Sequence, residues 1–393
     1  MRLLSHIALC LILVVPAGAT AQQSQPTAAF IIRLGTDTTA VERFTRSGNA
    51  YQIEQAIRSP RTSFRHTHLE LTPGGEIATF HLMFHRIDDP AGPLLGSTQM
   101  SHASGDSAIV EVKDGETAST RRIPARPGAV PSLPQSFLAY ELVAMRMRAS
   151  GADSMAVTLV NPSGAPTSVI ARRVGSDSMT FTLPFLTYRA HVDPAGRITR
   201  LYQPRGTSVE RVANVDVNRV AAAWAALDAS GKAMGPLSPR DSVSARVGDA
   251  TVKINYARPG KRGRVIFGDI VPWDTVWRTG ANDATVLTTD RDLVIDGTVI
   301  PAGSYSLFTL PTRSKTTLII NRETMRDGEP LAGTDYDASK DFARIAMTTK
   351  SLATPVQQFT IEITPRGARD GILRLAWDQR EMTVPVQLRG SAP

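Results

Sequence analysis

Short runs of β-forming residues, each ended by Gly, Pro, Asp or Asn, cover most of this 393-residue chain. The runs are rich in Val, Ile, Thr, Phe and Tyr, which suit a pleated sheet, and the residues between them suit tight turns. One hairpin pattern occurs twice, because residues 71–80 and 192–201 each place Pro and Gly between two such runs. The sequence therefore predicts a mainly β protein with an antiparallel meander over about 28–212.

One helix is expected beside this meander, at residues 215–230. Apolar residues recur through the segment at the spacing of one helix face. Asn214 or Asp216 is suited to cap its start, and Gly231 is suited to end it. We expect this helix to cover one face of the meander.

Gly and Pro residues at 235–239 predict a boundary between two domains. The expected order is a meander with its helix over 28–230, a linker over 231–244, and a second β-rich domain over 245–389. The N-terminal pattern resembles the half-barrel of periplasmic lipoprotein carriers, and this implies that a concave sheet holds an apolar ligand. A stretch with several Pro residues, 122–134, predicts a surface loop inside the meander.

The first residues predict export. A positive start at Arg2 is followed by an apolar run to Val15, and small residues end at Ala21, which is the layout of a secretory signal peptide over 1–21. The apolar run is shorter than the ~20 residues that span a bilayer, so no transmembrane segment is expected in the mature chain. The expected location is the periplasm or the extracellular space.

Composition excludes several kinds of chemistry. The only cysteine, Cys10, lies in the expected signal peptide, so the mature chain should contain neither disulfides nor thiolate catalysis. The 44 Lys and Arg residues exceed the 36 Asp and Glu residues, but they are scattered, and we expect no nucleic-acid partner. The sequence has no nucleophile elbow, zinc-protease motif, phosphate loop or dinucleotide fingerprint.

Histidines gather in the first copy of the repeated hairpin. If the turn is centred at 74–75, then His66, His68, His81 and His85 lie on one face of the two strands. This register places His68 directly opposite His81, with their Cβ atoms about 5 Å apart. Imidazoles at this spacing could hold zinc or copper, and no other cofactor is expected. The alternative is a polar sheet face that binds no metal.

The most specific part of the sequence combines Arg, aromatic residues and glycine turns at 256–282, and it continues at 303–308. It includes Tyr256-Ala257-Arg258-Pro259-Gly260, Trp277-Arg278-Thr279-Gly280-Ala281-Asn282 and Gly303-Ser304-Tyr305. These residues resemble the domain of unknown function 2911 family, over about 240–389. The resemblance implies an exported bacterial protein with a C-terminal β-sandwich and no established activity.

Planar arginine donors beside aromatic rings suit a carbohydrate or a ligand that bears a carboxylate. The candidate ligand residues are Tyr256, Arg258, Arg264, Trp277, Arg278, Asn282 and Tyr305. The alternative role is structural, because an arginine can cross the end of a sandwich, bond loop carbonyls and stack on tryptophan. Both roles remain open for each arginine.

Two classes of function follow. We expect a non-catalytic exported protein that binds a small molecule, a glycan or a lipid. The other class is a hydrolase that acts on glycans with a site of carboxylates, Arg and Tyr in the C-terminal domain. A close pair of carboxylates in a groove would favour the hydrolase, whereas a groove of Trp and Arg without such a pair would favour binding.

Overall fold

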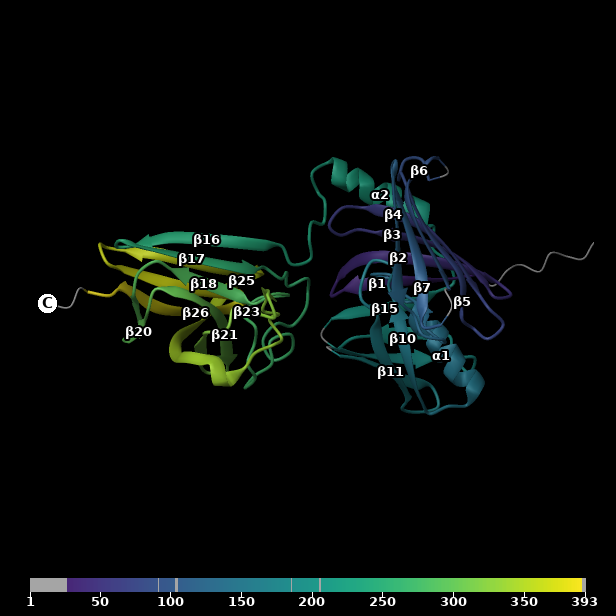
Figure 1. The fold of residues 1–393 in the computed structure, drawn as a ribbon. Helices are drawn as coiled ribbons and strands as arrows, with labels where there is room; N and C mark the ends of the chain where they lie inside the picture. Colours follow the sequence, from purple (N-terminus) through teal and green to yellow (C-terminus); the bar gives the residue numbers. More distant parts are fainter. Residues whose placement is uncertain (1–26, 91, 103–104, 185, 205, 391–393) are drawn as a thin grey trace, which may run out of the picture.

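The computed structural model describes residues 27–390 except 91, 103–104, 185 and 205. It contains a fifteen-stranded N-terminal sheet and a separate nine-stranded C-terminal sheet (Figure 1). The prediction of a mainly β fold with these two parts is confirmed. The expected signal peptide lies outside the described residues. In the part that is described, no helix has the length and apolar character needed to cross a membrane.

The N-terminal sheet consists of two meanders that meet in its middle. The first runs from β1 (Thr27–Leu34) to β8 (Thr117–Pro124), and the second from β9 (Val130–Pro131) to β15 (Thr207–Val212), with β1 paired to β15. The outer strands β8 and β9 are joined by residues 125–129 alone. So short a connection spans at most about 20 Å, so the sheet must curl until its two edges approach each other.

The strands between these ends follow one another in the sheet as they do in the chain. They are β2 (Asp37–Ser47), β3 (Ala50–Ile57), β4 (Ser63–Leu71), β5 (Ile77–His85), β6 (Leu94–His102), β7 (Ser107–Asp114), β10 (Ser154–Val160), β11 (Thr167–Arg173), β12 (Ser178–Leu183), β13 (Leu186–Val192) and β14 (Ile198–Tyr202).

Helix α1 (Leu138–Ser150) fills the inner face of this curled sheet, and the sequence analysis did not predict it. Leu138 and Met147 of the helix share one core with Phe30 and Phe181 of the sheet. Most residues of α1 are buried, on every side of the helix. The helix therefore lacks the one-sided apolar spacing by which a surface helix is found in a sequence.

The stretch 122–134 is not the surface loop that we expected. Its first residues complete β8, and Ala125, Ala129 and Val130 are buried in the same core as α1. The Pro and Gly residues do break the strand pattern, but Ala125, Ala129 and Val130 point to the inner face, while Arg126 between them is exposed.

Both copies of the repeated hairpin contact α1 at their turns. Arg146 of α1 donates a hydrogen bond to the carbonyl of Gly75, at 2.6 Å. In the second copy, Gly196 lies against the helix backbone, and a Cβ there would be 2.7 Å from the Cα of Met145. The repeat in the sequence thus corresponds to two hairpins that hold one helix.

Two buried carboxylates also tie α1 to the sheet. Glu42 of β2 accepts a hydrogen bond from the Phe137 N–H at the start of the helix, at 3.0 Å. Glu141 of α1 accepts from the Ile198 N–H at 2.8 Å and pairs with Arg211 at 2.6 Å. Burial raises the pKa of both carboxyl groups, and these hydrogen bonds oppose that rise.

Helix α2 (Val217–Ala229) covers the opposite face of the sheet, as predicted for the helix at 215–230. The Asp216 side chain caps it by accepting from the Arg219 N–H at 2.9 Å. Trp224 packs against Phe64 of β4. The first meander is therefore covered by a helix on each face.

The C-terminal sheet folds into two layers joined by one long strand. Strand β25 (Asp341–Arg366) pairs first with β22 (Thr316–Asn321) and then with β26 (Asp370–Leu388). Tyr256 of one layer meets Phe359 of β25 with ring centroids 5.9 Å apart. The other elements are β16 (Arg240–Val247), β17 (Ala250–Ala257), β18 (Thr285–Thr289), β19 (Leu293–Ile295), β20 (Thr298–Ile300), β21 (Gly303–Pro311), β23 (Met325–Arg326), β24 (Glu329–Pro330) and the 3-10 turn η1 (Ala338–Lys340).

We predict that the C-terminal sheet folds without the N-terminal one, because the main cores of the two sheets share no residue. A fragment over residues 238–393 should unfold in one cooperative transition when its melting is followed by circular dichroism. Aggregation of this fragment under conditions that keep the full chain monodisperse would show that the expected boundary is wrong.

We also predict that the contact of Gly196 with α1 contributes to stability. Gly196 (φ +83°) and Gly48 (φ +59°) both have left-handed backbones, but a Cβ at Gly48 would meet nothing within 4 Å. Gly48→Ala should lose only the ~1–2 kcal/mol of a left-handed alanine. Gly196→Ala should melt several degrees lower still, because its methyl group would displace the helix. Equal melting temperatures for the two variants would contradict this role.

Candidate functional site

A pocket of about 460 Å³ lies in the C-terminal sheet beside β1 of the N-terminal sheet. Its volume falls in the range of small-molecule sites. Part of the 256–282 motif forms its wall, together with one residue each from β21 and β26 and a loop at 333–336. The wall includes Leu34, Arg264, Trp277, Arg278, Asn282, Phe308, Thr334, Tyr336 and Trp377.

The end of the motif is a single antiparallel β-bridge followed by a tight turn. Trp277 exchanges two backbone hydrogen bonds with Thr309 of β21, at 2.7 and 2.9 Å. Thr279 and Asn282 then adopt positive φ values of 51° and 59°. A β-branched residue such as Thr279 seldom takes a left-handed backbone, whereas asparagine tolerates it, so the constraint lies mainly at Thr279. It places Arg278 in the wall of the pocket.

The Arg278 side chain is held in place, but its guanidinium has few hydrogen-bond partners in the described structure. Its Nε is 3.4 Å from the carbonyl of Gly280, and its two terminal nitrogens form no hydrogen bond or ion pair within the described residues. Its stem packs on Gly333, where a Cβ would lie 2.7 Å from the Arg278 Cδ. Burial lowers the pKa of Arg278, and no nearby carboxylate opposes this effect. Because a guanidinium stays protonated in proteins, the pocket contains an unbalanced positive charge.

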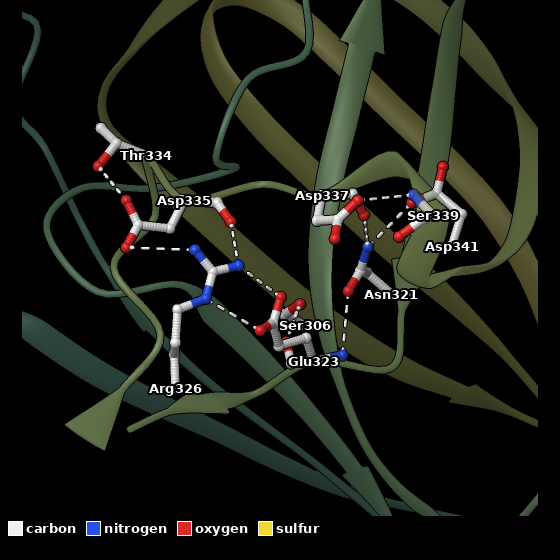
Figure 2. Close-up of polar contacts among 9 residues, drawn as sticks. All are labelled: Ser306, Asn321, Glu323, Arg326, Thr334, Asp335, Asp337, Ser339 and Asp341. Carbon is white, nitrogen blue, oxygen red and sulfur yellow. Dashed lines mark hydrogen bonds and ion pairs between the residues drawn. The ribbon is translucent and has the colours of Figure 1, made fainter. Parts of the chain in front are cut away.

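Polar contacts fix the loop that carries Thr334 (Figure 2). Arg326 donates to both carboxylate oxygens of Glu323, at 3.0 and 2.7 Å, and to the carbonyl of Asp335 at 3.0 Å. The Thr334 hydroxyl is 3.3 Å from the Asp335 carboxylate. These contacts hold the loop at the edge of the pocket.

The far end of the same loop is fixed by Asn321 (Figure 2). Its amide donates to the carbonyl of Asp337 at 2.9 Å and to the carboxylate of Asp341 at 3.0 Å. The Asp337 side chain accepts from the Ser339 N–H at 2.8 Å and so caps the turn η1. The acidic residues of this segment therefore have structural partners.

Tyr336 contributes its ring to the pocket and engages its hydroxyl elsewhere. The ring packs against Phe308, with centroids 4.9 Å apart. The hydroxyl donates to Asp341 at 2.8 Å and accepts from Arg344 at 2.7 Å. Burial, helped by the bond to Asp341, raises the pKa of Tyr336 to about 12. A phenol with this pKa is not suited to act as a base near neutral pH.

Two stacked tryptophans form an aromatic part of the wall. Trp277 and Trp377 have ring centroids 5.7 Å apart and planes only 22° from parallel, with Phe359 edge-on to Trp277 at 5.1 Å. Both indoles are buried, with 8% and 1% of their surface exposed. The Trp377 Nε1 is buried and has no partner among the described residues. Such an unpaired donor costs free energy unless something accepts from it.

Three of the predicted ligand residues lie outside this wall. The Tyr256 hydroxyl bonds the backbone of β25 inside the core. Arg258 pairs with Asp241 at 3.0 Å, and the Tyr305 hydroxyl donates to the carbonyl of Pro301 at 3.1 Å. For these residues the geometry matches the structural alternative.

Arg264 and Asn282 do lie in the wall, but they differ in exposure and in hydrogen bonding. The Arg264 guanidinium donates to the carbonyls of Gly260 and Lys261, at 2.6 and 3.1 Å, so it braces its own loop. Asn282 is exposed, and its carbonyl accepts from the Gly333 N–H at 2.8 Å. Among the four arginines of the motif, only Arg278 keeps both terminal nitrogens unbonded within the described residues.

A structural arginine of the kind considered for the motif occurs on β26 instead. Arg380 donates to the carbonyls of Thr312 and Lys315, at 2.8 and 3.1 Å. Its guanidinium also lies over the rings of Phe267 and Trp273, at 5.4 and 5.1 Å from their centroids. The sequence analysis did not select this residue, because it lies about a hundred residues after the motif.

The sequence analysis also missed Phe308, Tyr336 and Trp377 as pocket residues. A usable signal was the alternation of side chains along a strand. Tyr305 and Phe308 are three residues apart on β21, so they belong to opposite faces, and Phe308 is on the face of the pocket. Tyr336 and Trp377 reach the wall through tertiary packing that sequence spacing does not show.

At the histidine hairpin, the predicted register is confirmed. His68 of β4 lies opposite His81 of β5. A nitrogen of His68 is 2.7 Å from the side-chain nitrogen of Gln52 on the neighbouring strand β3. Burial lowers the pKa of His81, and the nearby positive charges of His68 and Lys113 lower it further.

The other two histidines of this face also have neighbours. His66 is 3.4 Å from a carboxylate oxygen of Glu54, and its ring meets His85 edge-on with centroids 5.1 Å apart. Within the described residues, no three His, Cys, Asp or Glu side chains are arranged to hold one metal ion. Zinc or copper binding at His66, His68, His81 and His85 stays a prediction.

The comparisons with known proteins place the pocket in a recognised family region. Residues 238–386 match the model of a family described as Protein of unknown function (DUF2911). The match spans β16 to β26 and includes most of the pocket wall, but Leu34 and Leu237 lie outside it. A comparison with curated proteins gave no match. The resemblance based on the motif is confirmed, and it leaves the activity open.

We predict that Arg278 contributes little to stability, in contrast to Arg380. Arg278→Ala removes one long hydrogen bond, whereas Arg380→Ala removes the guanidinium that donates to the Thr312 carbonyl and is one of three donors to the Lys315 carbonyl. Each buried acceptor left unpaired costs ~1–3 kcal/mol. The melting temperature of the full chain should therefore be several degrees lower in Arg380→Ala and hardly changed in Arg278→Ala. A comparable loss in both variants would make Arg278 a structural residue.

We also predict that His81 makes the protein less stable in acid. The folded protein holds the pKa of His81 below its ordinary value of 6.5, so the unfolded chain binds this proton more readily. The free energy of unfolding should fall as the pH is lowered from about 7.5 to about 5.5. In urea titrations, the free energy of unfolding of His81→Gln should fall less over this pH range than that of the unaltered chain. His102→Gln, the matched change at an exposed position, should show the same fall as the unaltered chain. An unchanged pH dependence in His81→Gln would contradict this.

Proposed function

We propose that this chain is an exported, non-catalytic binding protein whose C-terminal pocket holds a small anionic ligand with a planar or apolar body. Arg278 carries the proposal, since its guanidinium is fixed in the wall without a carboxylate partner in the described structure. A carboxylate or phosphate would bond its free nitrogens and balance its charge. Export rests on the sequence of residues 1–21.

The rest of the wall suits the remainder of such a ligand. Trp277, Phe308 and Tyr336 offer aromatic surface, and Asn282 and Thr334 offer polar groups at the rim. Trp377 holds an unpaired Nε1 donor in the same wall. The exposed lining is about as polar as it is apolar, so the pocket offers both kinds of contact to such a ligand.

The hydrolase alternative has less support in this pocket. Among the described residues, the wall contains no Asp or Glu, whereas glycan hydrolysis commonly requires two carboxylates. Tyr336, the tyrosine in the wall, is bonded to Asp341 and has a pKa of about 12. The arrangement therefore favours binding over acid–base catalysis.

The inner face of the N-terminal sheet gives less support to the apolar ligand implied by its resemblance to lipoprotein carriers. Helix α1 occupies the inner face, where that ligand was expected. The space left beside the helix near Leu69, Phe80 and Leu142 is about 20 Å³. This is room for about one water molecule.

The test uses 4-nitrobenzoate as a planar carboxylate probe. It quenches indole fluorescence, and Trp277 and Trp377 lie in the wall. We expect saturable quenching of the full chain, and much weaker quenching by the uncharged 4-nitrobenzamide. Arg278→Met should weaken binding at least about tenfold, since a hydrogen bond to a charged group is worth ~1.5–3 kcal/mol.

The matched control is Arg291→Met, which removes the same charge at an exposed position outside the pocket. Its affinity for 4-nitrobenzoate should equal that of the unaltered chain. Equal binding of the carboxylate and the amide, or full binding by Arg278→Met, would overturn the proposal.

A further inference from the structure

The turn between β1 and β2 contacts the motif of the other sheet. The Thr36 N–H donates to the carbonyl of Arg262 at 3.0 Å. The Asp37 carboxylate pairs with the Arg262 guanidinium. One backbone bond and one ion pair thus join the N-terminal sheet to loop 260–264.

Two glycines make this contact close. Gly35 and Gly263 both have left-handed backbones, with φ values of +62° and +70°. A Cβ at Gly35 would lie 2.0 Å from the Arg262 carbonyl oxygen, and a Cβ at Gly263 would lie 2.4 Å from the Thr36 side chain. A Cβ at Gly35 would displace the backbone of the opposite turn, and one at Gly263 would force the Thr36 side chain to move. The two turns are therefore complementary in shape.

Loop 260–264 has the pocket on one side and this turn on the other. Arg264 lines the pocket, and its Cγ is only 2.9 Å from where a Cβ of Gly35 would be. Leu34, the residue before the turn, is itself part of the pocket wall. Docking of the turn thus sets the position of an apolar side chain in the ligand site.

We propose that the β1–β2 turn is a specificity-determining part of the ligand site, with Leu34 contacting the apolar body of the ligand and Asp37 positioning it through Arg262. This inference rests on the proposed function of the pocket. It follows that ligand binding and docking of the turn strengthen each other, because each depends on the same arrangement of loop 260–264. The ligand class becomes an amphipathic anion, bound by Arg278 at one end and enclosed by Leu34.

Two measurements on the full chain test this with 4-nitrobenzoate. Asp37→Ala removes the ion pair at a residue that does not line the pocket, and it should weaken probe binding at least about fivefold. Saturating probe should also slow hydrogen exchange at the Thr36 amide in the unaltered chain, because that amide bonds the Arg262 carbonyl. Leu34→Ala should weaken the probe as well, by removing a wall contact.

The control is Asp153→Ala, which breaks an ion pair with Arg173, away from the turn in the N-terminal sheet. It should bind the probe as the unaltered chain does. If Arg278→Met loses the probe but Asp37→Ala and Leu34→Ala retain it, and exchange at Thr36 is unchanged, this inference fails and the proposed function stands. If the unaltered chain does not bind 4-nitrobenzoate in preference to the amide, both fail.

Discussion

The curled sheet of fifteen strands must bury its apolar inner face, and helix α1 supplies the inner cover on which the N-terminal fold depends. The helix is buried on every side, so its few polar groups need partners, and Glu42 and Glu141 serve as those links to the sheet. The two repeated hairpins close on it at Gly75 and Gly196. Curvature of the sheet and burial of the helix therefore require each other.

The C-terminal sheet differs in this respect, because the guanidinium of Arg278 has no ion-pair partner among the residues that the structure describes. The other arginines of the motif donate hydrogen bonds to carbonyls or to a carboxylate, as Arg258 and Arg264 do. The terminal nitrogens of Arg278 are not buried, so they are open to a ligand that carries an acceptor. The left-handed turn at Thr279 and the close packing of Gly333 keep Arg278 in that position. This is why the pocket, and not the hairpin of histidines, is the better candidate site.

Local patterns predicted the features that depend on neighbouring residues. The capped helix α2, the pairing of His68 with His81 and the turn after Trp277 all follow from spacing within one segment. Helix α1 was missed because its buried residues lie on every side of the helix, so it has no one-sided apolar spacing. The pocket was only partly predicted, since Trp377 comes from a strand about a hundred residues away and Leu34 from the other sheet. Those two contacts arise from packing, which spacing along the chain does not encode.

The open edges of the N-terminal sheet have a consequence for self-association. An unpaired strand edge can pair with the same edge of another molecule and begin aggregation. Here β9 has only two residues, one of them Pro131, which has no N–H to donate. The opposite edge, β8, is almost fully exposed, but it carries Arg121 and Arg122 and ends at Pro124. Charge repulsion on one edge and a short proline-containing strand on the other oppose edge-to-edge association in a protein that is rich in strands.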